Sequence, residues 1–182
     1  EVKGTLRGTA YHRFFEILNY DCCKDYNSIE EYLKTSVTAG KISEEYAGLI
    51  NLKRFEEFLQ TDLGKRMGSA YKKGLLFREQ PFIMELGADM IDKEYPSDEK
   101  ILVQGIVDAF FFEDDKVYIV DYKTDRVEQG KAGEKALVER YHKQLELYAD
   151  TISRVTGKET GGCYIYSTCL KKEILIEFPS YT

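Results

Sequence analysis

Two stretches in the middle of the chain have the composition of β-strands: Val103-Gln104-Gly105-Ile106-Val107-Asp108 and Val117-Tyr118-Ile119-Val120-Asp121-Tyr122-Lys123. Both are rich in β-branched and aromatic residues, which favour extended backbone. Between them, Glu113-Asp114-Asp115-Lys116 is typical of a tight polar turn. The pattern therefore predicts an antiparallel β-hairpin at the centre of the fold.

The register of this hairpin brings two acidic residues together. If Phe112 pairs with Val117, Asp108 lies directly opposite Asp121, and Lys123 shares the face of Asp121 because side chains alternate along a strand. Two facing carboxylates repel each other. A divalent cation between them would remove this penalty, and the lysine could then orient or activate a water molecule. The register thus predicts the site of a metal-dependent hydrolase.

The pattern alone leaves an alternative open. Acidic residues are common at strand ends, and a slip of the hairpin by one residue would turn one aspartate to the opposite face. Asp121, however, follows the apolar run 117–120, where an unpaired charge would be costly. This position favours the metal site.

The composition predicts one folded domain. The chain of 182 residues is long enough to bury a core, and 43% of it is hydrophobic and 13% aromatic. No apolar run approaches the roughly 20 residues that span a bilayer, and the first residues do not resemble a signal peptide. We therefore expect a cytoplasmic protein with no membrane partner. Because the chain starts at Glu1 rather than at a methionine, we also expect a piece of a longer protein.

Neither the cysteines nor the charge assign a function. Cys22 and Cys23 are adjacent, Cys163 lies in a predicted strand, and together with Cys169 they form no zinc-binding spacing. We expect four reduced thiols. The net charge of −6 does not point to a nucleic-acid binder, and the basic pairs between residues 53 and 73 are typical of solvated helix faces.

Helical patterns dominate about residues 1–76. An apolar stripe at helical spacing covers roughly residues 5–20. Further helices are expected to begin at capping residues, and glycines are expected to interrupt the last helical stretch. The capping residues are Ser28, Ser43 and Asn51, and the glycines are Gly64 and Gly68.

A sheet core is expected over about residues 77–182. Residues 77–86 have the pattern of a strand, and Pro81 confines this strand to a sheet edge or a bulge. Residues 87–100 are polar and acidic, which is typical of a loop or of the start of the hairpin.

The last third adds a helix and two strands. A helix is expected over about residues 134–156, ending at Gly157, and strands are expected at 163–168 and 173–178. The fold class is therefore α/β, with a central mixed sheet flanked by helices and a helical N-terminal part.

Three polar residues stand out from their surroundings. Gln144 lies in an apolar and aromatic helical stripe and needs a partner. The partner is either a backbone group or the active site, which Tyr141 would then share while Tyr148 belongs to the core. His12 is either a surface group or a metal ligand, since imidazole and carboxylate together suit Mg²⁺ or Mn²⁺. Glu79 is either a further site carboxylate or a surface charge.

Four motifs follow one another along the chain. They are Gly8-Thr9-Ala10-Tyr11-His12, Gln104-Gly105-Ile106-Val107-Asp108, Asp121-Tyr122-Lys123-Thr124 and Tyr141-His142-Lys143-Gln144-Leu145-Glu146-Leu147-Tyr148. In this order, the set resembles the RecB-like branch of the PD-(D/E)xK nucleases, and within it the AddA-type nuclease domains of bacterial AddAB helicase–nucleases. The resemblance covers about residues 4–166, and the order of the motifs makes it specific although each motif alone is weak.

This resemblance implies a fold and a metal site. The fold is a single restriction-endonuclease-like domain over residues 1–182, belonging to a larger helicase–nuclease. By position in the motifs, His12, Asp108 and Asp121 would hold Mg²⁺, with Mn²⁺ as a substitute, and the Tyr122 carbonyl would lie beside them.

The resemblance also implies a catalytic set. Lys123 corresponds to the catalytic lysine of the family and acts with Asp108 and Asp121. Gln144, together with Tyr141, matches the helical motif that lies near the site in this branch.

The implied function is hydrolysis of phosphodiester bonds in DNA, expected to be exonuclease activity on single strands during double-strand-break repair. The implied partners are DNA, the helicase part of the same parent chain and an AddB-type subunit. The chain contains no G-x4-G-K-[ST] loop and so no ATPase motor. Two alternatives stay open: a non-catalytic module that binds DNA or a partner protein, and a metal-dependent phosphohydrolase of small substrates.

Overall fold

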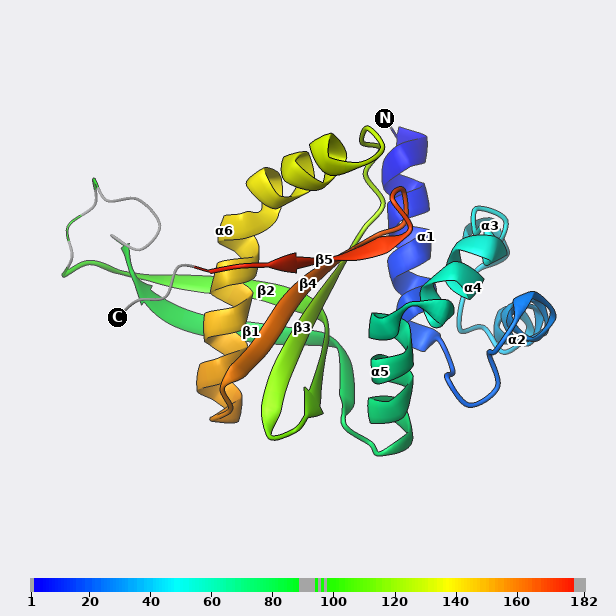
Figure 1. Cartoon of the computed structure of the whole chain (residues 1–182), viewed down its shortest axis with the longest axis horizontal. Coiled ribbons are helices and arrows are strands. Elements are labelled where there is room, and N and C mark those ends of the chain that lie inside the picture. Colours follow the sequence, from blue (N-terminus) through cyan, green and yellow to red (C-terminus); the bar gives the residue numbers. More distant parts are fainter. Residues whose placement is uncertain (1, 89–93, 95, 97, 179–182) are drawn as a thin grey trace.

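One five-stranded sheet forms the centre of the computed structural model, which describes residues 2–88, 94, 96 and 98–178 (Figure 1). The strand order follows the chain, so that β1 and β5 are the edges. Strands β3 and β4 are parallel and every other neighbouring pair is antiparallel. The predicted α/β class with a mixed sheet is confirmed. The strands are β1 (Leu76–Gly87), β2 (Lys100–Glu113), β3 (Lys116–Lys123), β4 (Thr160–Ser167) and β5 (Lys172–Ile176).

The central hairpin has the predicted register. Phe112 pairs with Val117, and the ladder between β2 and β3 continues to Ala109 and Val120. The turn residues Asp114 and Asp115 have φ angles of +49° and +63°. Two successive positive φ angles are what a two-residue hairpin turn requires, because they match the twist of the flanking strands.

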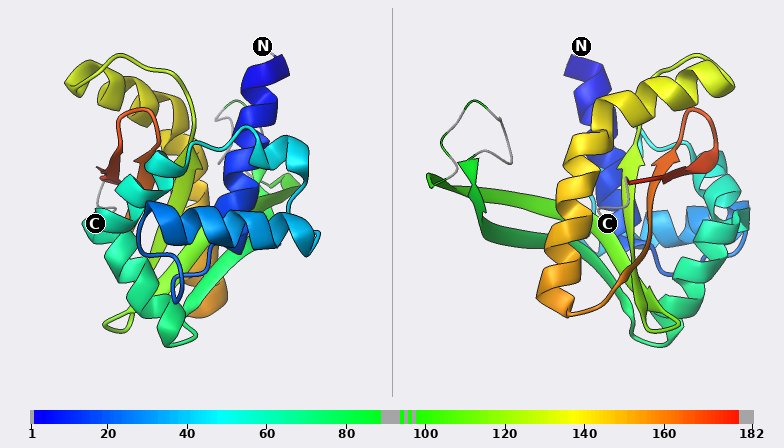
Figure 2. Two further views of the ribbon diagram at one scale, coloured as in Figure 1. Left: turned by 90° about the vertical axis from the view of Figure 1, so that its right-hand side faces the viewer. Right: turned by 60° about the vertical axis from the view of Figure 1, so that its left-hand side comes forward.

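Strands β2 and β3 separate at the end of this ladder. Beyond Ala109, β2 pairs only with β1, and the two continue as an arm that projects from the body of the molecule (Figure 2). One face of the arm packs on the last helix through Phe82, whereas Ile83 and Leu102 on the other face are exposed. Within the predicted polar loop at the tip of the arm, residues 89–93, 95 and 97 lie outside the described residues.

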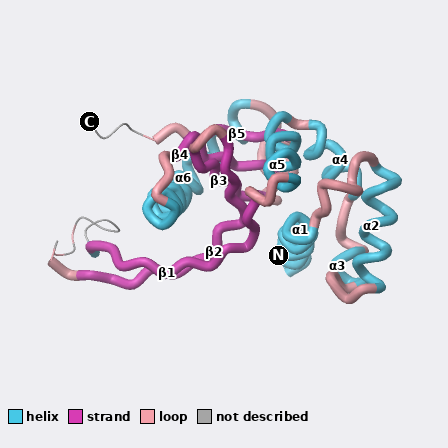
Figure 3. The backbone as a smooth tube through the Cα atoms, turned by 90° about the horizontal axis from the view of Figure 1, so that it is seen from below, coloured by secondary structure: helices cyan, strands magenta, loops and turns pink. Residues whose placement is uncertain are grey.

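Helices cover both faces of the sheet. Helix α6 lies against one face, α1 and α5 lie against the other, and the remaining helices pack on α1 and α5 (Figure 3). No helix in the described ranges has both the length and the apolar content that a membrane span requires. The helices are α1 (Val2–Ile17), α2 (Tyr26–Thr38), α3 (Glu44–Ala47), α4 (Leu52–Gln60), α5 (Asp62–Lys72) and α6 (Lys131–Thr156).

The alternation of side chains along β3 divides the core into two parts. Val117 and Ile119 point towards α6, whereas Tyr122 points towards α1. The ring of Tyr122 is stacked on Phe15 of α1, with the ring centroids 3.8 Å apart. This alternation also directs Asp121 to the α6 side of the sheet.

Several predicted boundaries are confirmed. Ser43 and Asn51 are the N-caps of α3 and α4, and Gly157 ends α6 in the left-handed conformation, with φ +66°. The predicted cap at Ser28 is wrong, since Asp25 caps α2 and accepts a hydrogen bond from the backbone N–H of Ser28. The Ser28 hydroxyl accepts in return from the N–H of Asp25, so that serine takes the part that glutamate usually plays in a capping box.

The predicted interruption by glycines is also wrong. Gly64 and Gly68 lie inside α5, and the break occurs at Thr61, whose hydroxyl accepts from the N–H of Gly64. Gly64 instead permits a close approach, because a Cβ atom there would lie 2.2 Å from the carbonyl oxygen of Phe58 in α4. The glycine thus serves the tight corner between the two helices.

We expect Gly64→Ala to lower the free energy of unfolding by about 2 kcal/mol, because the added methyl group must displace backbone. Gly48→Ala is the matched control, since its Cβ would meet no atom closer than 3.5 Å. The control should change stability by less than about 0.5 kcal/mol. Urea unfolding of both variants checks this, and equal stabilities would show that the corner relaxes freely.

Candidate metal centre and active site

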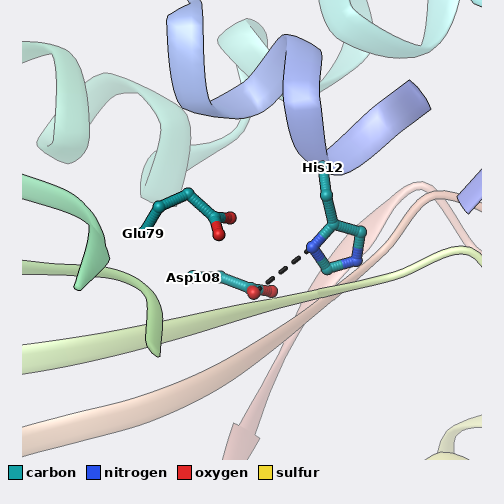
Figure 4. A group of neighbouring side chains, drawn as sticks. All are labelled: His12, Glu79 and Asp108. Carbon is teal, nitrogen blue, oxygen red and sulfur yellow. Dashed lines mark ion pairs between the residues drawn. The ribbon is translucent and has the colours of Figure 1, made fainter. Parts of the chain in front are cut away.

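Asp108 lies at the point where β2 leaves β3. Its Oδ2 atom accepts a hydrogen bond of 2.8 Å from the backbone N–H of Tyr122, and its Oδ1 atom lies 3.2 Å from Nδ1 of His12 (Figure 4). The carboxylate is therefore held between the central hairpin and α1. The structure thus brings together His12, Asp108 and the backbone of Tyr122, three of the positions that the family resemblance singles out.

Glu79 joins this group from the edge strand. Arg78 pairs with Ala109 and Gln80 with Val107, so Glu79 stands across from Asp108 although the two form no ladder pair. A φ of +48° at Glu79 marks a local break in β1 that directs the side chain. Each of these residues offers one atom that could bind a metal, a ring nitrogen of His12 or a carboxylate oxygen of Glu79 and Asp108. These three atoms all lie within 4.8 Å of one another. The interpretation of Glu79 as an ordinary surface charge is therefore not supported.

The strand register contains a signal for Glu79. The predicted pairing of Asp108 with Asp121 is not formed, because the ladder between β2 and β3 ends at Ala109 and Val120. On the other side, Glu79 stands across from Asp108 once Gln80 is paired with Val107. The charge of Asp108 reaches an acidic residue on each neighbouring strand, Glu79 on β1 and Asp121 on β3. The sequence pattern alone does not predict the register of β1 against β2, so the position of Glu79 across from Asp108 could not be predicted from it.

Asp121 and Lys123 form a buried ion pair on the α6 side. The Nζ atom of Lys123 lies 2.7 Å from Oδ2 of Asp121, and the two side chains are 13% and 4% exposed. Within the described residues this buried Oδ2 atom has no partner with hydrogen-bond geometry. Asp121 does not belong to the group of His12, Glu79 and Asp108 that lies within 4.8 Å.

Helix α6 contributes an aromatic wall. The ring of Tyr141 lies under Lys123, with Nζ 4.0 Å from the ring centroid, and its hydroxyl donates to Oδ1 of Asp125 at 2.8 Å. Gln144 is exposed and donates from Nε2 to the hydroxyl of the buried Tyr148 at 2.9 Å. The observed partner is thus a side chain of the same helix and not the backbone group that was one of the two alternatives. The other alternative, a contact with the active site, stays a prediction. A glutamine and a tyrosine four residues apart share a helix face, which accounts for the contact.

The electrostatics of the site reflect crowded carboxylates. Burial raises the pKa of Glu79 to about 7 and that of Asp121 to about 6, and the charge of Asp108 adds to both shifts. Burial lowers the pKa of His12, but the contact with Asp108 outweighs it and the net shift is upward. Burial likewise lowers the pKa of Lys123, and Asp121 outweighs it, so that the pKa of Lys123 is raised. Lys123 is therefore a cation at neutral pH.

These groups fit a hard divalent cation. Carboxylate oxygens and an imidazole nitrogen are suitable ligands for Mg²⁺ or Mn²⁺. A cation would offset the repulsion from Asp108 that, together with burial, raises the pKa values of Glu79 and Asp121. It would also give the buried Oδ2 atom of Asp121 a further partner beside Lys123. The described residues thus contain a donor set that is costly without a cation and suited to one.

We expect Glu79→Gln to stabilise the metal-free protein at pH 8 by roughly 1 kcal/mol, after allowance for solvent screening of this half-buried group. A raised carboxyl pKa contributes stability that is complete below the ordinary value of 4.5 and is lost as the pH rises through about 7. Glutamine removes that loss, so the gain should shrink towards pH 4.5. Urea unfolding in EDTA at both pH values measures it, with the exposed Glu139→Gln as control. Destabilisation at pH 8 would mean that a protein group already neutralises Glu79.

Comparison with known proteins supports the fold described above. The sequence profile of the PD-(D/E)XK nuclease superfamily matches residues 2–178. In Clostridium perfringens strain SM101, the A component of the ATP-dependent helicase/nuclease is 35% identical over 181 residues, covering 97% of this chain and 14% of that protein. The protein of the same name from Thermoanaerobacter sp. strain X514 is 38% identical over 163 residues, covering 88% of this chain and 13% of that protein.

The expected resemblance to AddA-type nuclease domains is thereby confirmed, and the α/β architecture agrees with a restriction-endonuclease-like fold. The chain spans about 14% of the length of the first of these relatives. By the match over residues 2–178, the chain belongs to the PD-(D/E)XK nuclease superfamily.

Proposed function

We propose that the domain cleaves single-stranded DNA as an exonuclease that depends on Mg²⁺, or on Mn²⁺ in its place. The proposal rests on the place where the strands β1, β2 and β3 meet helix α1. There, Glu79, Asp108 and His12 approach one another closely, and the pair of Asp121 and Lys123 lies on the next strand.

The proposed metal ligands are His12, Asp108 and Asp121, with the carbonyl of Tyr122. Glu79 is added to this set because its carboxylate approaches both His12 and Asp108. When bound, the cation would polarise the scissile phosphate and lower the pKa of a coordinated water molecule. The hydrogen bond from the Tyr122 N–H and the contact with His12 hold Asp108 in place before any substrate binds.

The proposed role of Lys123 is electrostatic. Its raised pKa keeps it protonated, so it is suited to orient the attacking water and to offset charge that grows on the phosphate. Asp121 and the ring of Tyr141 confine its ammonium group from two sides. Gln144 is exposed on α6, the helix that also carries Tyr141, and its amide nitrogen donates to Tyr148. Its carbonyl oxygen would then be available to solvent or substrate.

We further propose that residues 1–182 act as one nuclease domain of a longer helicase–nuclease in double-strand-break repair. Its partners would be DNA, a helicase region in the same chain and an AddB-type subunit. The support is that both relatives are named as components of an ATP-dependent helicase/nuclease and are much longer than this chain.

The test is cleavage of an end-labelled single strand, its duplex and the matching RNA, each in Mg²⁺ and in EDTA. The proposal predicts that the single-stranded DNA is shortened from an end, that the duplex and the RNA resist, and that EDTA stops the reaction. DNA binding that ignores metal and leads to no cleavage would favour the non-catalytic module. Turnover of nucleotides without turnover of DNA would favour a small-molecule phosphohydrolase.

A further inference from the structure

A pocket of about 320 Å³ adjoins the candidate metal centre. Helix α1 forms one wall, the segment that connects α2 to α3 forms the other, and His12 and Glu79 are among the lining residues. Those two residues also belong to the cluster with Asp108. A substrate phosphate at the metal centre would therefore lie beside this pocket.

The α1 wall presents a guanidinium group held in place. Arg13 donates from Nε to the carbonyl oxygen of Lys41 at 2.8 Å and from Nη1 to Oε2 of Glu16 at 2.5 Å. No hydrogen bond from its Nη2 atom occurs among the described residues, and the side chain is 36% exposed. The charge of Arg13 also reaches Glu79 and opposes the upward shift of that pKa. Arg13 is thus held in place on the pocket wall, with its Nη2 atom still able to donate.

The opposite wall combines polar and apolar groups. Ser43 and Lys41 are exposed there, Ile42 is buried beneath them, and Tyr46 is half-buried. Cationic donors beside an aromatic ring are the combination with which proteins hold single nucleic-acid strands, because the donors contact phosphate and the ring contacts sugar or base. The pocket therefore has both kinds of surface that a nucleotide requires.

The size of the pocket restricts what it can take. Small-molecule sites usually hold about 300–1,000 Å³, so 320 Å³ lies at the lower end of that range. This volume suits one nucleotide and is too small for a base pair. A strand that enters must therefore be unpaired at this point.

We propose that this pocket binds the nucleotide next to the scissile phosphate, with Arg13 contacting the flanking phosphodiester, and that it admits only an unpaired strand. The inference rests on the proposed nuclease function, whose substrate it specifies. It assigns a binding role to Arg13 and to the segment around Ser43, which lie outside the motifs that carry the family resemblance.

The experiment compares two substrates. A single-stranded oligonucleotide fills the pocket, whereas bis(p-nitrophenyl) phosphate is a phosphodiester with no nucleoside. Arg13→Gln should lower kcat/KM for the oligonucleotide about tenfold more than for the small diester, mainly through KM, because a charge-assisted hydrogen bond is lost. Arg154→Gln is the matched control, an arginine on α6 that pairs with Asp150.

A second variant separates binding from folding. Ser43→Asp keeps an N-cap for α3, since aspartate caps as well as serine does, but it places a negative charge on the pocket wall. It should weaken oligonucleotide cleavage selectively, as Arg13→Gln does. Equal losses on both substrates, or no loss on the oligonucleotide with either variant, would overturn the proposal.

A binding measurement keeps the two proposals apart. If the wild type hydrolyses neither substrate, the proposed function fails, and the pocket is then tested by the anisotropy of a labelled trinucleotide in Ca²⁺. Tenfold weaker binding by both variants supports the pocket even in that case. Binding equal to that of the wild type overturns it.

Discussion

Replacing Lys123 by alanine should lower the rate of DNA cleavage about a thousandfold, which is the order expected when a preorganised charge is removed from a developing oxyanion. Lys123 is held by Asp121 and by the ring of Tyr141, so its ammonium group has a defined position before substrate arrives. Metal binding should persist in this variant, because lysine is not one of the proposed ligands. End-labelled single-stranded DNA gives the rate, and calorimetry with Mn²⁺ gives the affinity.

Lys135→Ala is the control for this prediction. Lys135 is a lysine on α6 whose side chain is 78% exposed and pairs with Glu139. This variant should cleave at the rate of the wild type. A Lys123→Ala protein that retains a tenth or more of the activity would show that the lysine is not the charge on which cleavage depends.

Replacing Asp108 by asparagine should remove both cleavage and the response to metal. Asparagine can still accept the hydrogen bond from the Tyr122 N–H through its carbonyl oxygen. The local structure at the point where β2 separates from β3 should therefore persist. Burial raises the pKa values of Glu79 and Asp121, and loss of the Asp108 charge relieves the repulsion that adds to both shifts. The metal-free variant should therefore be more stable than the wild type at pH 8.

Thermal unfolding with and without Mn²⁺ checks this expectation. A ligand at a hundred times its Kd stabilises the folded state by about 2.7 kcal/mol, and this gain should appear in the wild type and vanish in Asp108→Asn. Asp115→Asn is the control, an exposed aspartate in the hairpin turn with a φ of +63° that asparagine tolerates. An Asp108→Asn protein that Mn²⁺ still stabilises fully would contradict the proposed ligand set.

The hairpin could be predicted because two independent signals agree there. The apolar pattern defines both strands, and the polar turn of Asp114 and Asp115 leaves one register that pairs Phe112 with Val117. Helix ends were harder to predict, because neighbouring residues compete for the same cap. Asp25 and Ser28 both have capping side chains, and the structure uses both in one reciprocal pair.

Only part of the candidate site could be predicted from the sequence. The register places Asp108, Asp121 and Lys123 near one another, but nothing in local pattern brings His12 of α1 to Asp108, and only the family resemblance suggested it. Glu79 depends on a left-handed backbone conformation, which strand propensity does not reveal. The contact between Gln144 and Tyr148 follows from helical spacing and could have been predicted.

The most direct test of the metal centre is anomalous diffraction from crystals grown with Mn²⁺. We predict one strong peak within about 2.0–2.3 Å of a nitrogen of His12 and an oxygen of Asp108, since these are ordinary bond lengths for such ligands. Asp121 or Glu79 should complete the set. A peak elsewhere, or none at saturating Mn²⁺ with Nδ1 of His12 still against Asp108, would contradict the proposed metal centre.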